Sequence, residues 1–176
     1  MTDPNDVTLH VATPRDATVL ANLLELYSHD LSDVFGLELG ADGRFGYAKL
    51  PLYWSEPERR FAFLIRRGGA LAGFALATRG SPVSDDPAVF DVAEFFVMRR
   101  HRGAGIGRTA AGLLWDRFAT PWTARVADAN RGGYGFWSNA IARYTDGAFT
   151  ETTRPGSPHP WRVFSFRSAS GPPGAE

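Results

Sequence analysis

The segment from Phe90 to Phe118 constrains the fold more than any other part of the chain. It reads as an apolar strand, a basic turn rich in glycine, and an amphipathic helix. The turn contains Gly103, Gly105 and Gly107, which lack a Cβ, so a ligand can approach the main chain closely and the backbone can adopt positive φ. The helix presents its first unpaired N–H groups and the positive end of its dipole at the same point. The segment therefore predicts a binding site for a phosphate or pyrophosphate group.

The charge of this turn differs from that of the rest of the chain. The sequence has 19 basic and 19 acidic residues and a formal net charge of zero. Four arginines nevertheless gather at the turn, namely Arg99, Arg100, Arg102 and Arg108. Because arginine binds phosphate through a fixed fork of N–H donors, this local excess predicts a large anionic cofactor. The balanced total charge argues against nucleic acid as a partner.

Two other phosphate-binding motifs fit this turn less well. The stretch from Gly105 to Ala110 matches a loose dinucleotide fingerprint, which needs a strand running directly into the first glycine and an acidic residue about twenty residues later. Seven residues separate Val97 from Gly105, and Arg125 stands where the acid should be. A Walker loop needs Gly-Lys-Ser/Thr, whereas residues 107–109 read Gly-Arg-Thr. We therefore reject both motifs.

Length and composition predict a single domain. A chain of 176 residues, 44% of them apolar, can build one substantial core, which we expect over residues 5–167, before a disordered tail over residues 168–176. The absence of cysteine excludes disulfides, thiolate nucleophiles and cysteine-based metal sites, and no metal site is predicted. The N-terminus reads as polar rather than as a signal peptide, and no apolar run is long enough to span a membrane. We therefore expect a cytoplasmic protein with no membrane partner.

Hydrophobic periodicity predicts the order of the elements. Helices are predicted over residues 13–31, 45–58, 106–118 and 134–144, the first opened by Thr13 as N-cap and Pro14 at the first helical position. Alternation and apolar runs predict strands over residues 7–11, 61–65, 71–78, 89–98, 122–128, 149–153 and 161–166. The resulting order is β-α-α-β-β-β-α-β-α-β-β.

The strand, turn and helix resemble the coenzyme A signature of the GCN5-related N-acetyltransferase (GNAT) superfamily. That signature reads Arg/Gln-x-x-Gly-x-Gly/Ala after a strand ending in Val, and here it is Arg102-x-x-Gly105-x-Gly107 with Val97 five positions before the arginine. The resemblance implies an α/β (α+β) fold with a mixed central sheet of six to seven strands, flanked by about four helices. The sheet is expected to splay between its fourth and fifth strands, and the predicted element order agrees with this fold.

The resemblance also implies the cofactor, acetyl-CoA, and the residues that hold it. Backbone groups at the splay, on Phe95, Phe96 and Val97, are expected to bind the pantetheine arm. The pyrophosphate is expected on the turn, where the contacts come from Arg102, Gly103, Ala104, Gly105, Ile106, Gly107 and Arg108. We call residues 103–108 the cradle.

A second stretch similar to the family begins at Asn130. It has Gly133 at a small-residue position, the aromatic pair Phe136 and Trp137, and a Gly-x-Phe ending at Gly147, although the interval before that glycine is longer than usual. Asn130 is expected to bond the pantetheine amide, to cap a helix, or both. Trp137 is expected near the cofactor, at a position where many members carry a tyrosine that serves as the acid.

The resemblance implies direct transfer of an acetyl group to a primary amine of a small molecule or a protein. For the base we expect Glu94, with Asp91 as the second candidate; strand alternation places the two on opposite faces unless a bulge changes the register. A backbone N–H, that of Val97, is expected to polarise the carbonyl. Because an indole cannot usefully release a proton, Tyr144 is considered as the acid in place of Trp137.

The acceptor pocket is expected to be formed by the loop after the first helix and the segment before the third strand. A lining of carboxylates and aromatic rings suits a cationic amine. The candidates are His29, Asp30, Tyr53 and Trp54, with Ser32, Asp33 and Tyr47 beside them. The sequence does not name the acceptor, and pairing into a homodimer stays open. Two other functions also stay open: a coenzyme A-binding sensor without turnover, which Trp137 favours, and transfer of a different acyl group.

Overall fold

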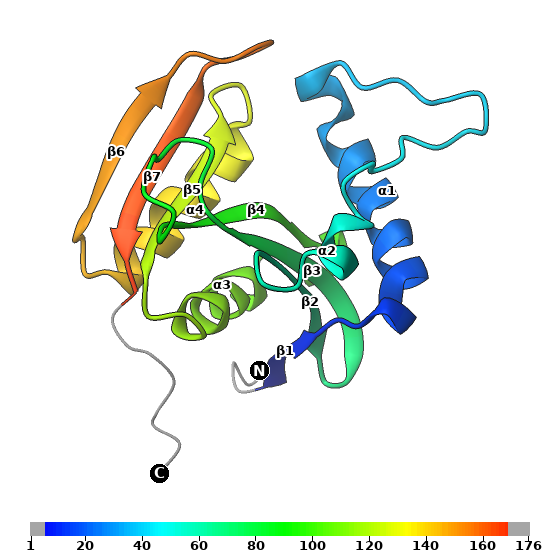
Figure 1. The fold of residues 1–176 in the computed structure, drawn as a ribbon, viewed down its shortest axis with the longest axis horizontal. Helices are drawn as coiled ribbons and strands as arrows, with labels where there is room; N and C mark the ends of the chain where they lie inside the picture. The colour runs from blue at the N-terminus through cyan, green and yellow to red at the C-terminus, as the bar shows by residue number, and fades with distance from the viewer. Residues whose placement is uncertain (1–5, 169–176) are drawn as a thin grey trace.

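The computed structural model describes residues 6–168, which form one seven-stranded mixed sheet with helices on both faces (Figure 1). The elements are β1 (Val7–Val11), α1 (Ala17–Phe35), α2 (Leu52–Ser55), β2 (Arg60–Arg67), β3 (Ala70–Arg79), β4 (Phe90–Val97), α3 (Ile106–Asp116), β5 (Pro121–Ala127), α4 (Arg131–Tyr144), β6 (Phe149–Arg154) and β7 (Trp161–Arg167). The strand order is β1-β2-β3-β4-β5-β7-β6, and only β4 and β5 pair in parallel. The expected mixed sheet is confirmed. The tail predicted over residues 168–176 lies outside the described residues except for Ser168.

Two apolar layers hold the helices against the sheet. On one face, Leu20, Leu23 and Leu24 of α1 pack against Phe74 and Leu76 of β3. On the other face α3 and α4 share a core with β4, β5 and β7, which contains Leu114, Trp115, Trp122, Ile141 and Phe164. Because both faces are covered, the middle residues of β2 and β3 are buried, and this is why these two strands contain nearly continuous apolar runs.

The parallel pair of strands separates soon after it forms. Pairing between β4 and β5 covers only Phe90–Val92 against Trp122–Ala124, and β5 continues in antiparallel pairing with β7. The remainder of β4, residues 93–97, therefore has β3 beside it on one edge only. This is the splay between the fourth and fifth strands that the sequence predicted, and it opens the middle of the sheet.

A β-bulge on β4 changes which side chains share a face. Leu76 of β3 is paired with Glu94, but the next residue, Ala77, is paired with Val92, so Ala93 is an extra residue on β4. A strand with one extra residue reverses its alternation at that point. Asp91 and Glu94 consequently lie on the same face of the sheet, the face that α1 covers. Of the two arrangements that the sequence left open, the structure contains the bulged one.

The predicted helix over residues 45–58 is much shorter in the structure. Only α2, Leu52–Ser55, is helical, and turns occupy the residues before it. Gly46 adopts a φ of 72°, which ends any regular helix there, and Pro57 pushes the preceding residue out of the helical region, so that Glu56 has φ −122° and ψ 57°. The segment between α1 and α2 is therefore mostly a loop, which extends outward from the end of α1 before it returns to α2 (Figure 1).

No helix within residues 6–168 combines the length and the apolar character that crossing a membrane requires.

Candidate active site

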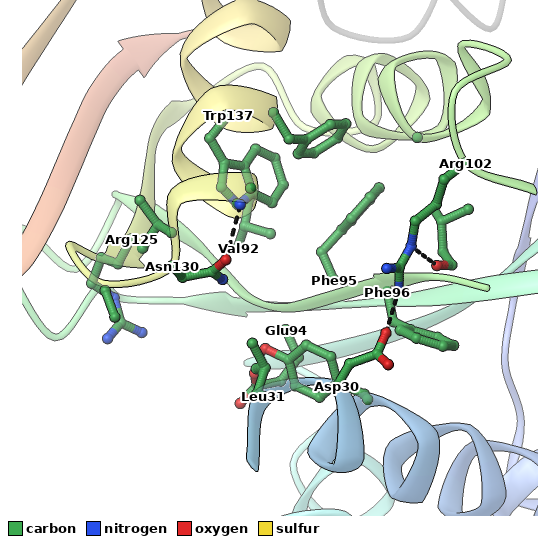
Figure 2. Close-up of a pocket in the computed structure, with 18 of the residues that line it drawn as sticks. Asp30, Leu31, Val92, Glu94, Phe95, Phe96, Arg102, Arg125, Asn130 and Trp137 are labelled. Carbon is green, nitrogen blue, oxygen red and sulfur yellow. Dashed lines mark hydrogen bonds and ion pairs between the residues drawn. The ribbon is translucent and has the colours of Figure 1, made fainter. Parts of the chain in front are cut away.

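A continuous cleft of about 1030 Å³ lies at the splay and joins the two faces of the sheet (Figure 2). At one end it is bounded by the cradle and the start of α3, and at the other end by α1 and the loop that follows it. In between it is lined by residues 92–97 of β4 and residues 125–127 of β5. The cleft therefore connects the predicted phosphate site with the predicted base.

The cradle has the backbone shape that the glycine pattern predicted. Gly105 is the N-cap residue of α3 and has a φ of 80°, in the left-handed region that disfavours side chains. Gly107 is needed for a different reason, since a Cβ there would lie 2.9 Å from Cε2 of Phe136 on α4. The N-terminus of an 11-residue helix thus opens onto the cleft with its amides uncovered by side chains.

Asp30 ties the arginines beside the cradle to α1. Arg99 Nη2 donates to Asp30 Oδ1 at 2.9 Å, and Arg102 donates to Asp30 Oδ2 and, through Nε, to the carbonyl of Val97 at 2.7 Å (Figure 2). Burial acts to raise the pKa of Asp30, but the hydrogen bonds and charges of the two arginines outweigh it, so the pKa of Asp30 is lowered. Asp30, which the sequence suggested as an acceptor contact, therefore lies at the end of the cleft that the cradle bounds.

The free edge of β4 directs backbone groups into the splay. The N–H of Met98 bonds the carbonyl of Ala72 on β3 at 2.8 Å. Because antiparallel pairing alternates, the N–H and C=O groups of Val97 and Phe95 point away from β3, toward the side where β5 has diverged. The Arg102 contact to the Val97 carbonyl agrees with this direction. Phe95, Phe96 and Val97 all line the cleft.

Asn130 caps α4 and also lines the cleft. Its Oδ1 accepts the N–H of Gly133 at 3.0 Å, and a Cβ on Gly133 would lie 2.6 Å from Asn130 Nδ2 (Figure 2). The cap is therefore observed, while a contact to pantetheine stays a prediction. Trp137 lies one turn further along α4, with Phe95 and Phe136 against it at ring-centroid distances of 5.2 and 4.8 Å.

Glu94 is held by two tyrosines on the α1 side of the cleft. Its carboxylate accepts hydrogen bonds from the hydroxyls of Tyr27 at 2.7 Å and Tyr47 at 3.0 Å. Burial raises the pKa of Glu94, and the two hydrogen bonds together with the charges of Arg125 and Lys49 oppose the rise. A carboxylate with a raised pKa, enclosed but open to the cleft, is suited to accept a proton.

Asp91 is engaged in a buried ion pair. Its side chain is 1% exposed and accepts from Arg125 Nη2 at 2.8 Å, from Arg125 Nε at 3.3 Å and from Thr123 Oγ1 at 2.7 Å. Thr123 is its neighbour on β5 in the short parallel register. These contacts join the two strands just before they separate, and they point to a structural role for Asp91.

We expect Asp91→Asn to lower stability through this ion pair. Removing one partner of a buried pair costs about 3–5 kcal/mol. Arg125 keeps 23% of its side chain exposed, so about 2 kcal/mol is expected here, or a fall in Tm of roughly 4–8 °C. Asp128→Asn is the matched control, because its pair with Arg162 is exposed and should change Tm little. Equal Tm values for the two variants in thermal denaturation would contradict the structural role.

Four other predicted residues do not line this cleft. His29, Tyr53, Trp54 and Tyr144 are absent from its lining. Tyr53 is 4% exposed and packs in the α1 core, with the Arg60 guanidinium over its ring. Trp54 packs against the same core, and His29 is exposed on α1. The hydroxyl of Tyr144 donates to Asp116 Oδ1 at 2.6 Å, so it is directed to the end of α3 and not toward Glu94.

A family model and several solved structures match this chain, and all of them describe acetyltransferases. The model of the acetyltransferase (GNAT) family matches residues 20–138. Among solved structures, an acetyltransferase from Thermus thermophilus is similar with a TM-score of 0.65 and 21% identity, over 94% of this chain and 98% of the other. Spermidine N-acetyltransferase from Vibrio cholerae, solved with CoA and spermine, has a TM-score of 0.65 and 13% identity, over 94% and 98%. The Salmonella typhimurium protein yncA, solved with its cofactor acetyl-CoA, has a TM-score of 0.62 and 14% identity, over 98% and 100%. No curated protein matches the sequence significantly.

Proposed function

The chain belongs to the acetyltransferase (GNAT) family, and we propose that it transfers an acetyl group from acetyl-CoA to a primary amine of a small molecule or a protein. The observation that carries this proposal is the position of Glu94. Its carboxylate, held by two tyrosines, lines the same cleft as the anion-binding cradle and lies across the splay from it. An N-acetyltransferase needs these two features within reach of one another.

The residues present fit coenzyme A. The amides at the start of α3 and the guanidinium groups of Arg102 and Arg108 supply positive potential for a pyrophosphate, and the free edge of β4 supplies hydrogen-bonding groups for an extended arm. We assign the pyrophosphate to the cradle and the pantetheine arm to Phe95, Val97 and Asn130. When bound, acetyl-CoA supplies the acetyl group as a thioester, which an amine can attack directly.

The residues around Glu94 supply the proton chemistry. We propose that Glu94 takes a proton from the attacking ammonium, directly or through a water molecule, and that Tyr27 and Tyr47 hold the carboxylate in place through their hydroxyls. The N–H of Val97 is the donor that we assign to the reacting carbonyl. Attack is direct in this scheme, because the chain has no cysteine to carry an acyl group. The amine nitrogen bonds the acetyl carbon as the bond from that carbon to sulfur breaks, and coenzyme A leaves as a thiolate that takes a proton from water.

The pH dependence of turnover tests the role of Glu94. Glu94 acts as a base only when it is deprotonated, so kcat should rise through its pKa, which burial raises above the ordinary value of 4.5. The Tyr27 hydroxyl stabilises the charged carboxylate, so Tyr27→Phe should move this acidic limb to higher pH. Tyr134→Phe is the control, since that hydroxyl bonds Glu151 at 3.4 Å instead. If kcat of Tyr27→Phe rises at the same pH as kcat of the unsubstituted protein, Glu94 is not the group whose deprotonation controls turnover.

A second function, binding of coenzyme A without turnover, is favoured by Trp137. This residue stands where the family resemblance expects a tyrosine, and its indole cannot usefully release a proton. Release of free thiol from acetyl-CoA across a broad panel of amines separates the two functions. A protein that only binds should give heat with coenzyme A in calorimetry and release no thiol with any amine.

A further inference from the structure

The part of the cleft around Glu94 on the α1 side carries charges that are informative about the acceptor. We call this part the acceptor chamber, and the residues that define it are Phe35, Tyr47, Lys49, Glu94, Arg125 and Trp161. They come from α1, the loop after it, β4, β5 and β7. The chamber is thus built from segments far apart in the sequence.

The chamber combines the carboxylate of Glu94, which forms no ion pair within residues 6–168, with two cations, Lys49 and Arg125. Asp91 is neutralised by Arg125, and Asp30 is neutralised by two arginines at the cofactor end. Among residues 6–168, the hydrogen bonds to the Glu94 carboxylate come from tyrosine hydroxyls alone. Lys49 is the other charged group that defines the chamber, and both Lys49 and Arg125 lie near enough to Glu94 for their charges to lower its pKa. The summed charge of Glu94, Lys49 and the Asp91–Arg125 pair is zero.

Arg125 keeps donors available for a ligand. Its Nε and Nη2 form a fork with Asp91, which leaves the N–H groups of Nη1 without a hydrogen bond among the described residues. The guanidinium lies over the ring of Trp161 at 5.7 Å, and Phe35 stacks on that ring at the same centroid distance, so the arginine is fixed in position. Figure 2 shows it at the β5 side of the cleft, projecting away from the strand.

These charges do not suit a polycation. An amine with further positive charges would place them beside Lys49 and Arg125, with only Glu94 to balance them, and like charges in a partly enclosed site repel strongly. A zwitterion matches the chamber, because its ammonium group can face Glu94 while its carboxylate accepts hydrogen bonds from Arg125 and pairs with Lys49.

We propose that the acceptor is a small amino carboxylic acid, such as a free amino acid, whose carboxylate is bound by Arg125 and Lys49 while its amine faces Glu94. That the amino acid is acetylated rests on the proposed function. That its carboxylate is bound by Arg125 and Lys49 can be tested without turnover, because the N-acetylated product keeps the carboxylate and should still bind.

The test compares matched amines that differ only in the carboxylate. Thiol release from acetyl-CoA is measured with the protein amino acids, with their amides, with their decarboxylated amines, and with spermidine. For the best amino acid we expect kcat/KM to be at least tenfold higher than for its amide or its decarboxylated amine. Lys49→Glu should reduce this ratio at least tenfold, mainly through KM, because it places a negative charge beside the carboxylate. Arg44→Gln is the control, since it removes an exposed cation from the same loop that does not line the cleft.

Binding provides a readout independent of turnover. In calorimetry with coenzyme A present, the N-acetyl amino acid should bind at least tenfold more tightly than its N-acetyl amide, and Lys49→Glu should abolish the difference. If spermidine or the decarboxylated amines release thiol as fast as the amino acids, the inference is wrong and the proposed function stands. If coenzyme A binds but no amine releases thiol, the proposed function fails. In that case the affinities of the N-acetyl amino acid and the N-acetyl amide still test the binding of the carboxylate, and equal affinities for the two ligands overturn the inference.

Discussion

Replacing Glu94 with glutamine is expected to lower kcat/KM for thiol release from acetyl-CoA by about 10²- to 10⁴-fold, the usual contribution of a positioned general base. Glutamine keeps the size of the side chain and an oxygen that can accept from Tyr27 or Tyr47, but it cannot take a proton. The affinity for coenzyme A should stay within twofold of the unsubstituted protein, because the cradle is at the other end of the cleft. Initial rates and calorimetry measure the two quantities.

The stability of this variant distinguishes a lost base from a lost fold. Burial raises the pKa of Glu94 in the folded state, so the folded protein binds a proton more readily than the unfolded chain does. The contribution of Glu94 to stability is therefore greatest below the unfolded pKa and declines as the pH rises through the folded pKa. Glu94→Gln should accordingly match or exceed the Tm of the unsubstituted protein at pH 8, and should lose this advantage near pH 4. Full turnover by Glu94→Gln across the pH range would refute the assignment of the base.

The strand–turn–helix unit that contains the cradle is local in sequence, and for that reason its backbone shape could be predicted. Gly105 has its positive φ within that unit, whereas the need for glycine at position 107 comes from Phe136 on α4, which spacing within the unit does not record. The order of elements along the chain follows from similar local signals, since most strands are apolar runs or alternating segments bounded by turn residues. The prediction was wrong over residues 45–58, where apolar spacing suggested a helix that Gly46 and Pro57 interrupt.

The acceptor half depends on contacts that no local pattern records. Tyr27 reads as one member of the apolar stripe of α1, and its partner Glu94 is 67 residues away along the chain. One extra residue, Ala93, decides that Asp91 shares the face of Glu94, and strand alternation alone gave no sign of that bulge. Tyr53 and Trp54 looked like pocket residues because they are aromatic and follow a loop, but α2 turns them into the α1 core. The presence of a glutamate on β4 was the available signal for the site.

Gly105→Val is expected to weaken the binding of coenzyme A by about 10- to 100-fold. A β-branched residue is strained at a φ of 80°, so the turn should shift and withdraw an amide from the pyrophosphate. One lost bond to a charged group, at about 1.5–3 kcal/mol, accounts for this range. Gly69→Val is the matched control, because Gly69 has a φ of 78° in the β2–β3 hairpin, where nothing lies within 4 Å of a Cβ. Both variants should lose about 1–2 kcal/mol of stability from the same strain. The two variants should therefore have similar Tm values in thermal denaturation but different affinities for coenzyme A in calorimetry. Equal affinities of the two variants for coenzyme A would show that the cradle is not where the pyrophosphate binds.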